Sequence, residues 1–218
     1  MSINNFRGQI SPGLVPASVA DQVYHAMLDA IVAGALAAGA AVHDREWALA
    51  LGVSRTPVRE AIQRLDGLGL LDVAPARYTR LRSFSPEAAA REARDWASLH
   101  HALVSALHAA VPEGLLEVLH AIREAFLRLV RAGKDAVVEH FAFFNALREA
   151  SPSYSMRLGA TAAAYRLRLA EPSLAHTPQA HGELQSGIVH ALAGGGVHHA
   201  RHALASWINH PRTSPLAR

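Results

Sequence analysis

Two arginines one helical turn apart, Arg55 and Arg59, are the side chains best suited to bind phosphate groups and nucleobase edges. Each carries a planar guanidinium whose N–H donors can engage two acceptors at once. Apolar side chains around them recur at the spacing of one helix face: Val58, Ala61, Ile62 and Leu65. This spacing predicts a helix with one buried stripe. The opposite face carries Thr56, Arg59, Glu60 and Gln63. The arginines then project from its N-terminal end, as in a helix that enters the major groove of DNA.

A shorter helix is predicted directly before this segment, over residues 44–51. Asp44 is a suitable N-cap for it, and Gly52 permits a tight turn into the next helix. Ser54 is a suitable N-cap for the second helix, and Pro57 is tolerated in the first turn, where no helical hydrogen bond is lost. The two segments therefore predict a helix-turn-helix.

A two-stranded hairpin is predicted after the second helix. Residues 70–73 and 79–82 have the composition of strands, and residues 75–78 that of a turn. This hairpin makes the predicted motif a winged helix-turn-helix. An earlier helix, from Ser18 to about residue 34, is expected to pack behind it. We place the whole unit at residues 1–84.

The segment GVSRTPVREAI at residues 52–62, with IVAGALAAGAAV before it and GLGLLDVAPARYTRL after it, resembles the GntR family of bacterial transcription regulators. The resemblance implies a domain that binds double-stranded operator DNA. The residues expected to contact DNA are Arg45, Ser54, Arg55, Thr56, Arg59, Gln63, Arg77 and Arg80, with Arg45 added by the resemblance. The family usually has a glycine after the arginine of the wing turn, where this chain has Tyr78. Arg77 or Arg80 is therefore expected to contact phosphate rather than the groove floor.

The composition is that of a globular protein inside the cell. The 218 residues include 50% hydrophobic and 18% charged side chains, and the net charge is +3. No apolar run reaches the ~18 residues typical of a membrane span, and the N-terminus lacks the pattern of a signal peptide. The absence of cysteine excludes disulfides and thiolate metal sites. We expect a cytoplasmic protein without a membrane partner.

A second, all-helical domain is expected over residues 85–218. Ser85 is a suitable N-cap, and Pro86 fits the first helical position. Helices are predicted at 86–110, 113–132, 134–150, 153–170, 178–193 and 197–209. The overall fold class is mainly α: a winged helix-turn-helix followed by a helical bundle. This order resembles the FadR-like branch of the GntR family, in which the C-terminal helical domain binds a small effector and forms the homodimer.

Twelve of the fourteen histidines fall in this second domain, which raises the possibility of a metal site. His198 and His202 have the i, i+4 spacing of a helical pair, and His100, His101 and His108 lie along one helix. Solvated or hydrogen-bonded histidines on alanine-rich helices are the plainer explanation of these patterns.

Many relatives hold a divalent metal in the helical domain, and the resemblance aligns its ligand positions with His140, Phe144, Gln185 and Trp207. Phe144 and Trp207 supply no donor, so we expect no metal and no other cofactor. A one-residue shift in alignment would offer Asn145, and His181, His202 or His210 could approach from neighbouring turns. The four aligned residues are instead expected to bind an uncharged or partly aromatic effector.

Three classes of function fit these patterns to different degrees. A small-molecule-controlled transcription regulator, more often a repressor in this kind of protein, explains both domains. An architectural DNA-binding protein without an effector would leave the second domain with dimerisation alone. A metal-dependent hydrolase with an appended DNA-binding domain would need catalytic residues, and the sequence contains no HExxH pair and no GxSxG elbow. We therefore expect a non-enzymatic homodimeric regulator without catalytic residues.

Overall fold

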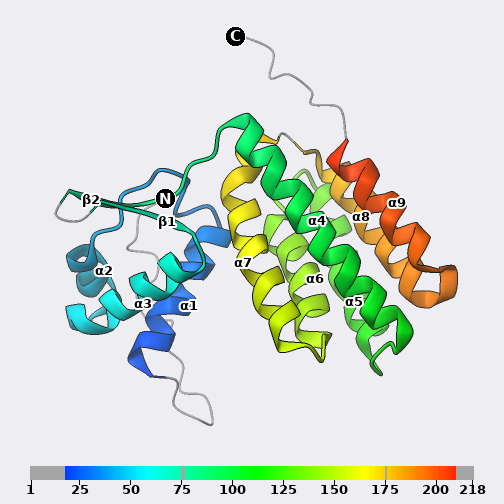
Figure 1. Ribbon diagram of the computed structural model, residues 1–218, viewed down its shortest axis with the longest axis horizontal. Helices are drawn as coiled ribbons and strands as arrows, with labels where there is room; N and C mark the ends of the chain where they lie inside the picture. The colour runs from blue at the N-terminus through cyan, green and yellow to red at the C-terminus, as the bar shows by residue number, and fades with distance from the viewer. Residues whose placement is uncertain (1–17, 75–76, 175, 210–218) are drawn as a thin grey trace. The chain divides into compact units, whose positions relative to one another are not determined.

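The chain folds into two compact units, Met1–Phe84 and Ser85–Arg218. Their structure is a computed structural model that describes residues 18–74, 77–174 and 176–209 (Figure 1). Each unit has its own buried core, so the two are described separately below.

The N-terminal unit begins with three helices, α1 (Val19–Val32), α2 (Asp44–Leu51) and α3 (Arg55–Gly67). Ser18 caps α1 through a reciprocal capping box with Asp21, which satisfies donors at the helix start. Helix α1 packs against α3, and the two helices contribute the buried side chains Val23, Met27, Ile31, Val58, Ala61 and Leu65. The apolar stripe predicted for α3 is thus buried, although Ile62 is only half-buried.

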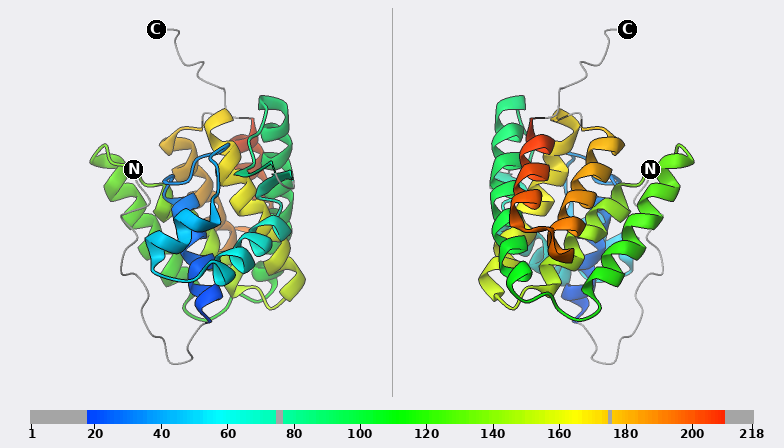
Figure 2. Two further views of the ribbon diagram at one scale, coloured as in Figure 1. Left: turned by 90° about the vertical axis from the view of Figure 1, so that its left-hand side faces the viewer. Right: turned by 90° about the vertical axis from the view of Figure 1, so that its right-hand side faces the viewer.

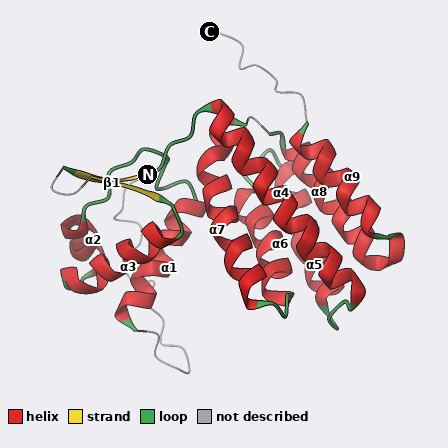
Figure 3. Ribbon diagram, in the orientation of Figure 1, coloured by secondary structure: helices red, strands yellow, loops and turns green. Residues whose placement is uncertain are grey.

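Two short strands, β1 (Leu71–Ala74) and β2 (Tyr78–Leu81), form the antiparallel hairpin of this unit (Figure 3). Each strand lies one residue from its predicted position, and the register pairs Leu71 with Leu81. Both leucines are buried in the core, which anchors one end of the hairpin. An isolated bridge between Ala41 and Arg80 adds a third short segment beside β2. The hairpin is therefore a wing attached to the helix-turn-helix.

The C-terminal unit contains helices α4 (Pro86–Ala109), α5 (Leu115–Arg131), α6 (Val137–Ala150), α7 (Tyr154–Ala170), α8 (Pro178–His190) and α9 (Val197–Ile208). A 3-10 turn, η2 (Glu171–Ser173), joins α7 to α8, and a π turn, η3 (Ala191–Gly195), extends α8. Ser85 caps α4 with Pro86 at its first position, as predicted. Helix α4 packs against α7 and α9, and α8 lies beside α9 (Figure 2).

Close contact between α8 and α9 depends on Gly187. A Cβ atom added at this position would lie 2.4 Å from the Cβ of Ala203 on α9, which no real contact allows. Helical Gly159 on α7 differs, because its added Cβ would lie 4.0 Å from the nearest atom, Leu99 Cδ2. The two glycines therefore form a matched pair of helical positions, one crowded and one open.

We expect Gly187→Ala to lower the free energy of unfolding by about 1–3 kcal/mol, because α8 and α9 must separate to accept the methyl group. Gly159→Ala is the control and is expected to raise it by up to about 1 kcal/mol through the higher helix propensity of alanine. Urea denaturation of both variants measures the difference. Equal stability of the two variants would contradict this account of the α8–α9 contact.

Candidate nucleic-acid interface and helical-domain cavity

The turn between α2 and α3 is tight because Gly52 adopts a left-handed conformation, with φ of 68°. Its N–H closes α2 by donating to the carbonyl of Ala48. Ser54 occupies the N-cap position of α3, but its side chain makes no capping hydrogen bond. His43, and not Asp44 as predicted, occupies the N-cap position of α2. Asp44 is the first helical residue. The local prediction was wrong by one residue, and Asp44 is left with another role.

All eight side chains expected to contact DNA are exposed: Arg45, Ser54, Arg55, Thr56, Arg59, Gln63, Arg77 and Arg80. Thr56, Arg59 and Gln63 lie on the side of α3 away from its buried stripe, and Arg55 lies in its first turn. Their exposure leaves all eight side chains available to a partner.

Asp44 pairs with two arginines of α3, Arg55 and Arg59. Nη2 of Arg55 donates to both carboxylate oxygens of Asp44 at 3.0 Å, and Nε of Arg59 donates to Oδ2 at 2.7 Å. The hydrogen bonds from Arg59 and then Arg55 lower the pKa of Asp44 below its usual value. The carboxylate therefore stays charged at neutral pH and orients both guanidinium groups. Sequence analysis missed this pairing because it assigned Asp44 to a cap.

A groove of about 510 Å³ lies between α3 and the wing. Arg59 and Gln63 line it from α3, and Arg77 and Tyr78 line it from the wing. The structure thus brings three of the predicted DNA contacts to one concave surface. Arg45, Ser54, Arg55, Thr56 and Arg80 do not line this groove.

Several other arginines of the unit already have partners within it. Nη1 of Arg64 donates to Asp21 at 2.6 Å, and its guanidinium lies 3.8 Å from the centre of the Tyr24 ring. Arg80 lies 3.6 Å from Asp72 and stacks over the ring of Tyr78. Arg64 therefore ties α3 to α1, and Arg80 stiffens the wing.

In the helical unit, the four residues expected to bind an effector are all buried: His140, Phe144, Gln185 and Trp207. The amide nitrogen of Gln185 lies 3.1 Å from Nδ1 of His140, and the rings of His140 and Phe144 are 5.1 Å apart. The ring of Trp96 contacts both Phe144 and Trp207, with centre-to-centre distances of 4.7 Å and 4.9 Å. Sequence analysis did not identify Trp96.

His140 lines two adjoining cavities. One, of about 190 Å³, is also lined by Lys134, Asp135, His176 and His181. The other, of about 20 Å³, is lined by residues that include Phe144 and Arg148. Burial lowers the pKa of His140 well below its usual value, with smaller contributions from His181 and His176, so this imidazole is neutral.

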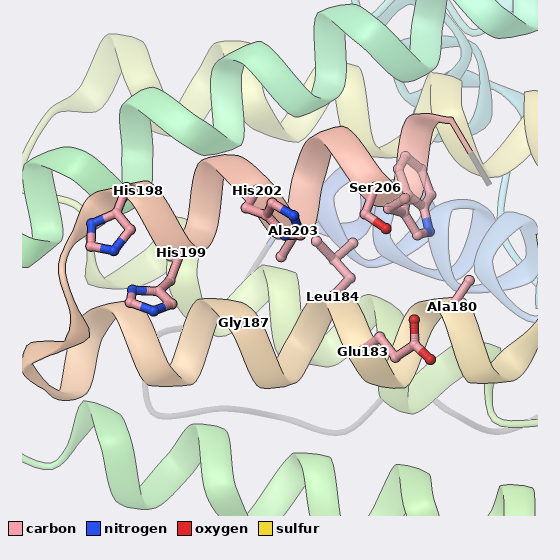
Figure 4. Close-up of a pocket in the computed structure, with 10 residues that line it drawn as sticks. Ala180, Glu183, Leu184, Gly187, His198, His199, His202, Ala203 and Ser206 are labelled. Atoms are coloured by element: carbon pink, nitrogen blue, oxygen red, sulfur yellow. The ribbon is translucent and has the colours of Figure 1, made fainter.

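Trp207 lines a different space, a groove of about 490 Å³ between α8 and α9 (Figure 4). His198 lies toward one end of this groove, His202 lies near its middle, and Glu183 lies toward the other end. The exposed pair His198 and His202 therefore lines a different space from buried His140. His100 belongs to neither set, because it is fully buried and its Nδ1 lies 2.9 Å from the carbonyl oxygen of Trp96.

One group of side chains could share a metal ion. Donor atoms of His140, Glu171 and His181 all lie within 4.8 Å of one another. Glu171 lies just beyond the helix predicted over residues 153–170, and η2 brings it near His140. Burial raises the pKa of Glu171 to about 7, and the neighbouring Arg168 opposes that shift.

The surroundings of this group already satisfy two of its members. Nη1 of Arg168 donates to Glu171 at 3.4 Å, and the indole N–H of Trp207 donates to Nδ1 of His181 at 3.3 Å. A neutral His181 that accepts at Nδ1 carries its proton on Nε2, which is the nitrogen 4.0 Å from Glu171. A metal at Nε2 would have to displace that proton. The group fits a hydrogen-bonded cluster better than a preformed metal site.

Among the described residues, no helix combines the length and the apolar character needed to cross a membrane.

Comparison with known proteins places the N-terminal unit in a family. Residues 19–80 match the gntR family of bacterial regulatory proteins. Over 75 residues the chain is 41% identical to the probable D-xylose utilization operon transcriptional repressor of Paenarthrobacter nicotinovorans. That match covers 34% of this chain and 33% of the relative, so the chain spans about a third of the length of this relative.

Solved structures resemble the chain over most of its length. E. coli McbR/YncC superposes with a TM-score of 0.73 at 23% identity, covering 88% of this chain and 94% of that protein. The GntR protein of Rhodococcus sp. RHA1 superposes with a TM-score of 0.70 at 21% identity and the same coverage. These likenesses show a shared fold, with a helix-turn-helix followed by a helical domain. The match over residues 19–80 therefore identifies a domain of the gntR family of bacterial regulatory proteins within the N-terminal unit.

Proposed function

We propose that the whole chain is a transcription regulator that binds double-stranded operator DNA through residues 1–84 and acts as a repressor. The observation that carries this proposal is the groove between α3 and the wing, where exposed Arg59, Gln63 and Arg77 meet in a gntR-type domain. Arg59 and Gln63 are suited to base edges in the major groove, and Arg77 to phosphate. The repressor assignment follows the relative that matches this domain, a probable D-xylose utilization operon transcriptional repressor.

The helical unit, residues 85–218, is proposed to bind a small effector and to form the homodimer. A single N-terminal unit makes few contacts with DNA. Two such units joined through their helical units bind a two-fold operator at high effective concentration. The buried cavities beside His140 give this unit space for a ligand, which an architectural protein would not need. The proposed place of action is the cytoplasm.

The regulator is distinguished from the architectural alternative by ligand response. Footprinting on the DNA next to the gene for this protein would define the operator, and a thermal-shift screen with small acids and sugars would test for an effector. For a regulator, one of these compounds raises the melting temperature and changes the affinity for the operator. An architectural protein protects the DNA without responding to any compound.

We expect Arg59→Ala to weaken operator binding about tenfold or more, because a bidentate contact from arginine to guanine contributes ~1–3 kcal/mol. Arg77→Ala should weaken binding to operator and random DNA equally, because a phosphate contact carries no sequence information. Titrations of both DNAs at fixed salt measure the effects, and melting temperatures check that both variants fold. Unchanged operator binding by Arg59→Ala, or an operator-selective loss in Arg77→Ala, would contradict the proposed docking.

Asp44 is proposed to act as a positioning residue for Arg55 and Arg59. Asp44→Asn should bind random DNA more tightly, because a negative charge near the phosphates is lost. It should also lower the ratio of operator to random affinity roughly three- to tenfold, because both guanidinium groups lose their fixed partner. The matched control is Glu60→Gln, which removes an exposed charge from α3 and should keep the ratio. The same ratio in wild type and Asp44→Asn would rule out a positioning role.

The helical unit is proposed to work without a resident metal, because Arg168 and Trp207 already hold Glu171 and His181. Elemental analysis of protein purified without a histidine tag should therefore find far less than one zinc or nickel per chain. Near-stoichiometric metal that disappears in His140→Ala would overturn this proposal. Metal that disappears in His202→Ala instead would place an ion at the exposed histidine pair of α9.

A further inference from the structure

Arg148, in the last turn of α6, is a fully buried cation with an incomplete set of partners. Its Nη2 donates to the side-chain oxygen of Asn145 at 3.0 Å. Nε and Nη1 are both buried and, within the described part of the chain, have no hydrogen-bond partner. The guanidinium carbon lies 5.1 Å from the centre of the Phe141 ring, which adds only a weak cation–π contact.

A charge buried in this way is costly, and native proteins normally give it a counterion. Burial lowers the pKa of Arg148 to about 10, so the group still carries its charge at neutral pH. Electrostatic attraction to Tyr165 and then to Glu149 opposes that shift. Among the described residues, no carboxylate lies within ion-pair distance of this guanidinium. Something outside the protein could therefore supply the missing acceptor.

The space beside Arg148 fits one end of a small molecule. The cavity of about 20 Å³ that Arg148 lines has room for little more than one water-sized group. Val137 and His140 line both this cavity and the larger one of about 190 Å³, so the two adjoin. A ligand could place a charged oxygen against Arg148 and its body in the larger space.

The charges around the two cavities favour an anion. Glu171 is neutralised by Arg168, and His140 is neutral. Lys134 and Asp135 line the larger cavity and offset each other. Arg148 thus remains as an uncompensated positive charge. The aromatic rings of Trp96, Phe141 and Phe144 line the smaller cavity and exclude water from the expected ion pair.

We propose that Arg148 binds an anionic group, a carboxylate or a phosphate, of the small-molecule effector. The anion accepts hydrogen bonds from the free N–H groups of the guanidinium and provides its counterion. This inference refines the proposed effector control and rests on it for its biological meaning. It replaces the uncharged effector expected from the sequence by an anionic one, while the aromatic surroundings remain.

The test compares anions with uncharged molecules of the same shape. Acetate and benzoate are paired with acetamide and benzamide, and inorganic phosphate is included at constant ionic strength. We expect at least one anion to raise the melting temperature of the wild-type protein by about 2–8 °C and its uncharged counterpart to have no effect. Arg148→Met should lose that shift. Without ligand it should melt at or above the wild-type temperature, because an unpaired buried charge is removed.

Arg157→Met is the matched control, because Arg157 also lies in the helical unit but donates to the Ser151 carbonyl. It should melt below wild type and keep the anion-dependent shift. Arg148→Lys retains a charge without the guanidinium geometry and should show a reduced shift, which keeps the test open if Arg148→Met does not fold. No anion-dependent shift in wild type, or an equal shift in Arg148→Met, would overturn the proposal.

Operator titrations separate this inference from the proposed function. An anion that stabilises wild type but not Arg148→Met, and that leaves operator affinity unchanged, supports the binding site and refutes effector control. A change in operator affinity that Arg148→Met abolishes supports both.

Discussion

Burial of the apolar face of α3 against α1 determines where the polar side chains of α3 can lie. Val58 and Leu65 are fully buried in this contact, so the rotation of α3 about its own axis has one favoured value. Arg59 and Gln63 must then face outward, beside the wing. The hydrophobic contact is non-directional in itself, but the helical period converts it into a defined direction for the guanidinium groups.

Charge is handled in opposite ways by the two units. On the surface, Asp44 holds Arg55 and Arg59 at short distance, yet both arginines keep more than half of their side-chain surface exposed. Exchange of that carboxylate for phosphate costs little, because water already solvates the groups. Inside the helical unit, Arg148 is fully buried and cannot bond to water instead. A missing hydrogen-bond acceptor therefore costs more free energy there than at Arg55 or Arg59.

Trp96 organises the interior of the helical unit in the way that α1 organises the N-terminal one. Its ring contacts Phe144 from α6, Trp207 from α9 and His100 from its own helix. Phe144 and Trp207 thus pack as rings at two of the positions that the family resemblance aligned with metal ligands, and neither ring supplies a metal-binding atom. The donors that remain, on η2 and α8, are drawn into hydrogen bonds with Arg168 and Trp207. Trp207 belongs to both regions, because it lines the groove between α8 and α9 and donates to His181, which lines the cavity beside His140.

The sequence alone determined the helices, the turn at Gly52, the wing and the outward face of α3, because periodicity, caps and positive-φ glycines are properties of consecutive residues. It could not place Asp44 against Arg59, since that contact depends on the angle between two helices. Nor did it single out Arg148, because an arginine in the last turn of a helix can usually reach solvent even when its spacing from Phe144 and Leu147 places it on the buried face. Only tertiary packing decided that Arg148 is enclosed and that Glu171 approaches His140, because burial depends on which helices cover a residue from elsewhere in the chain.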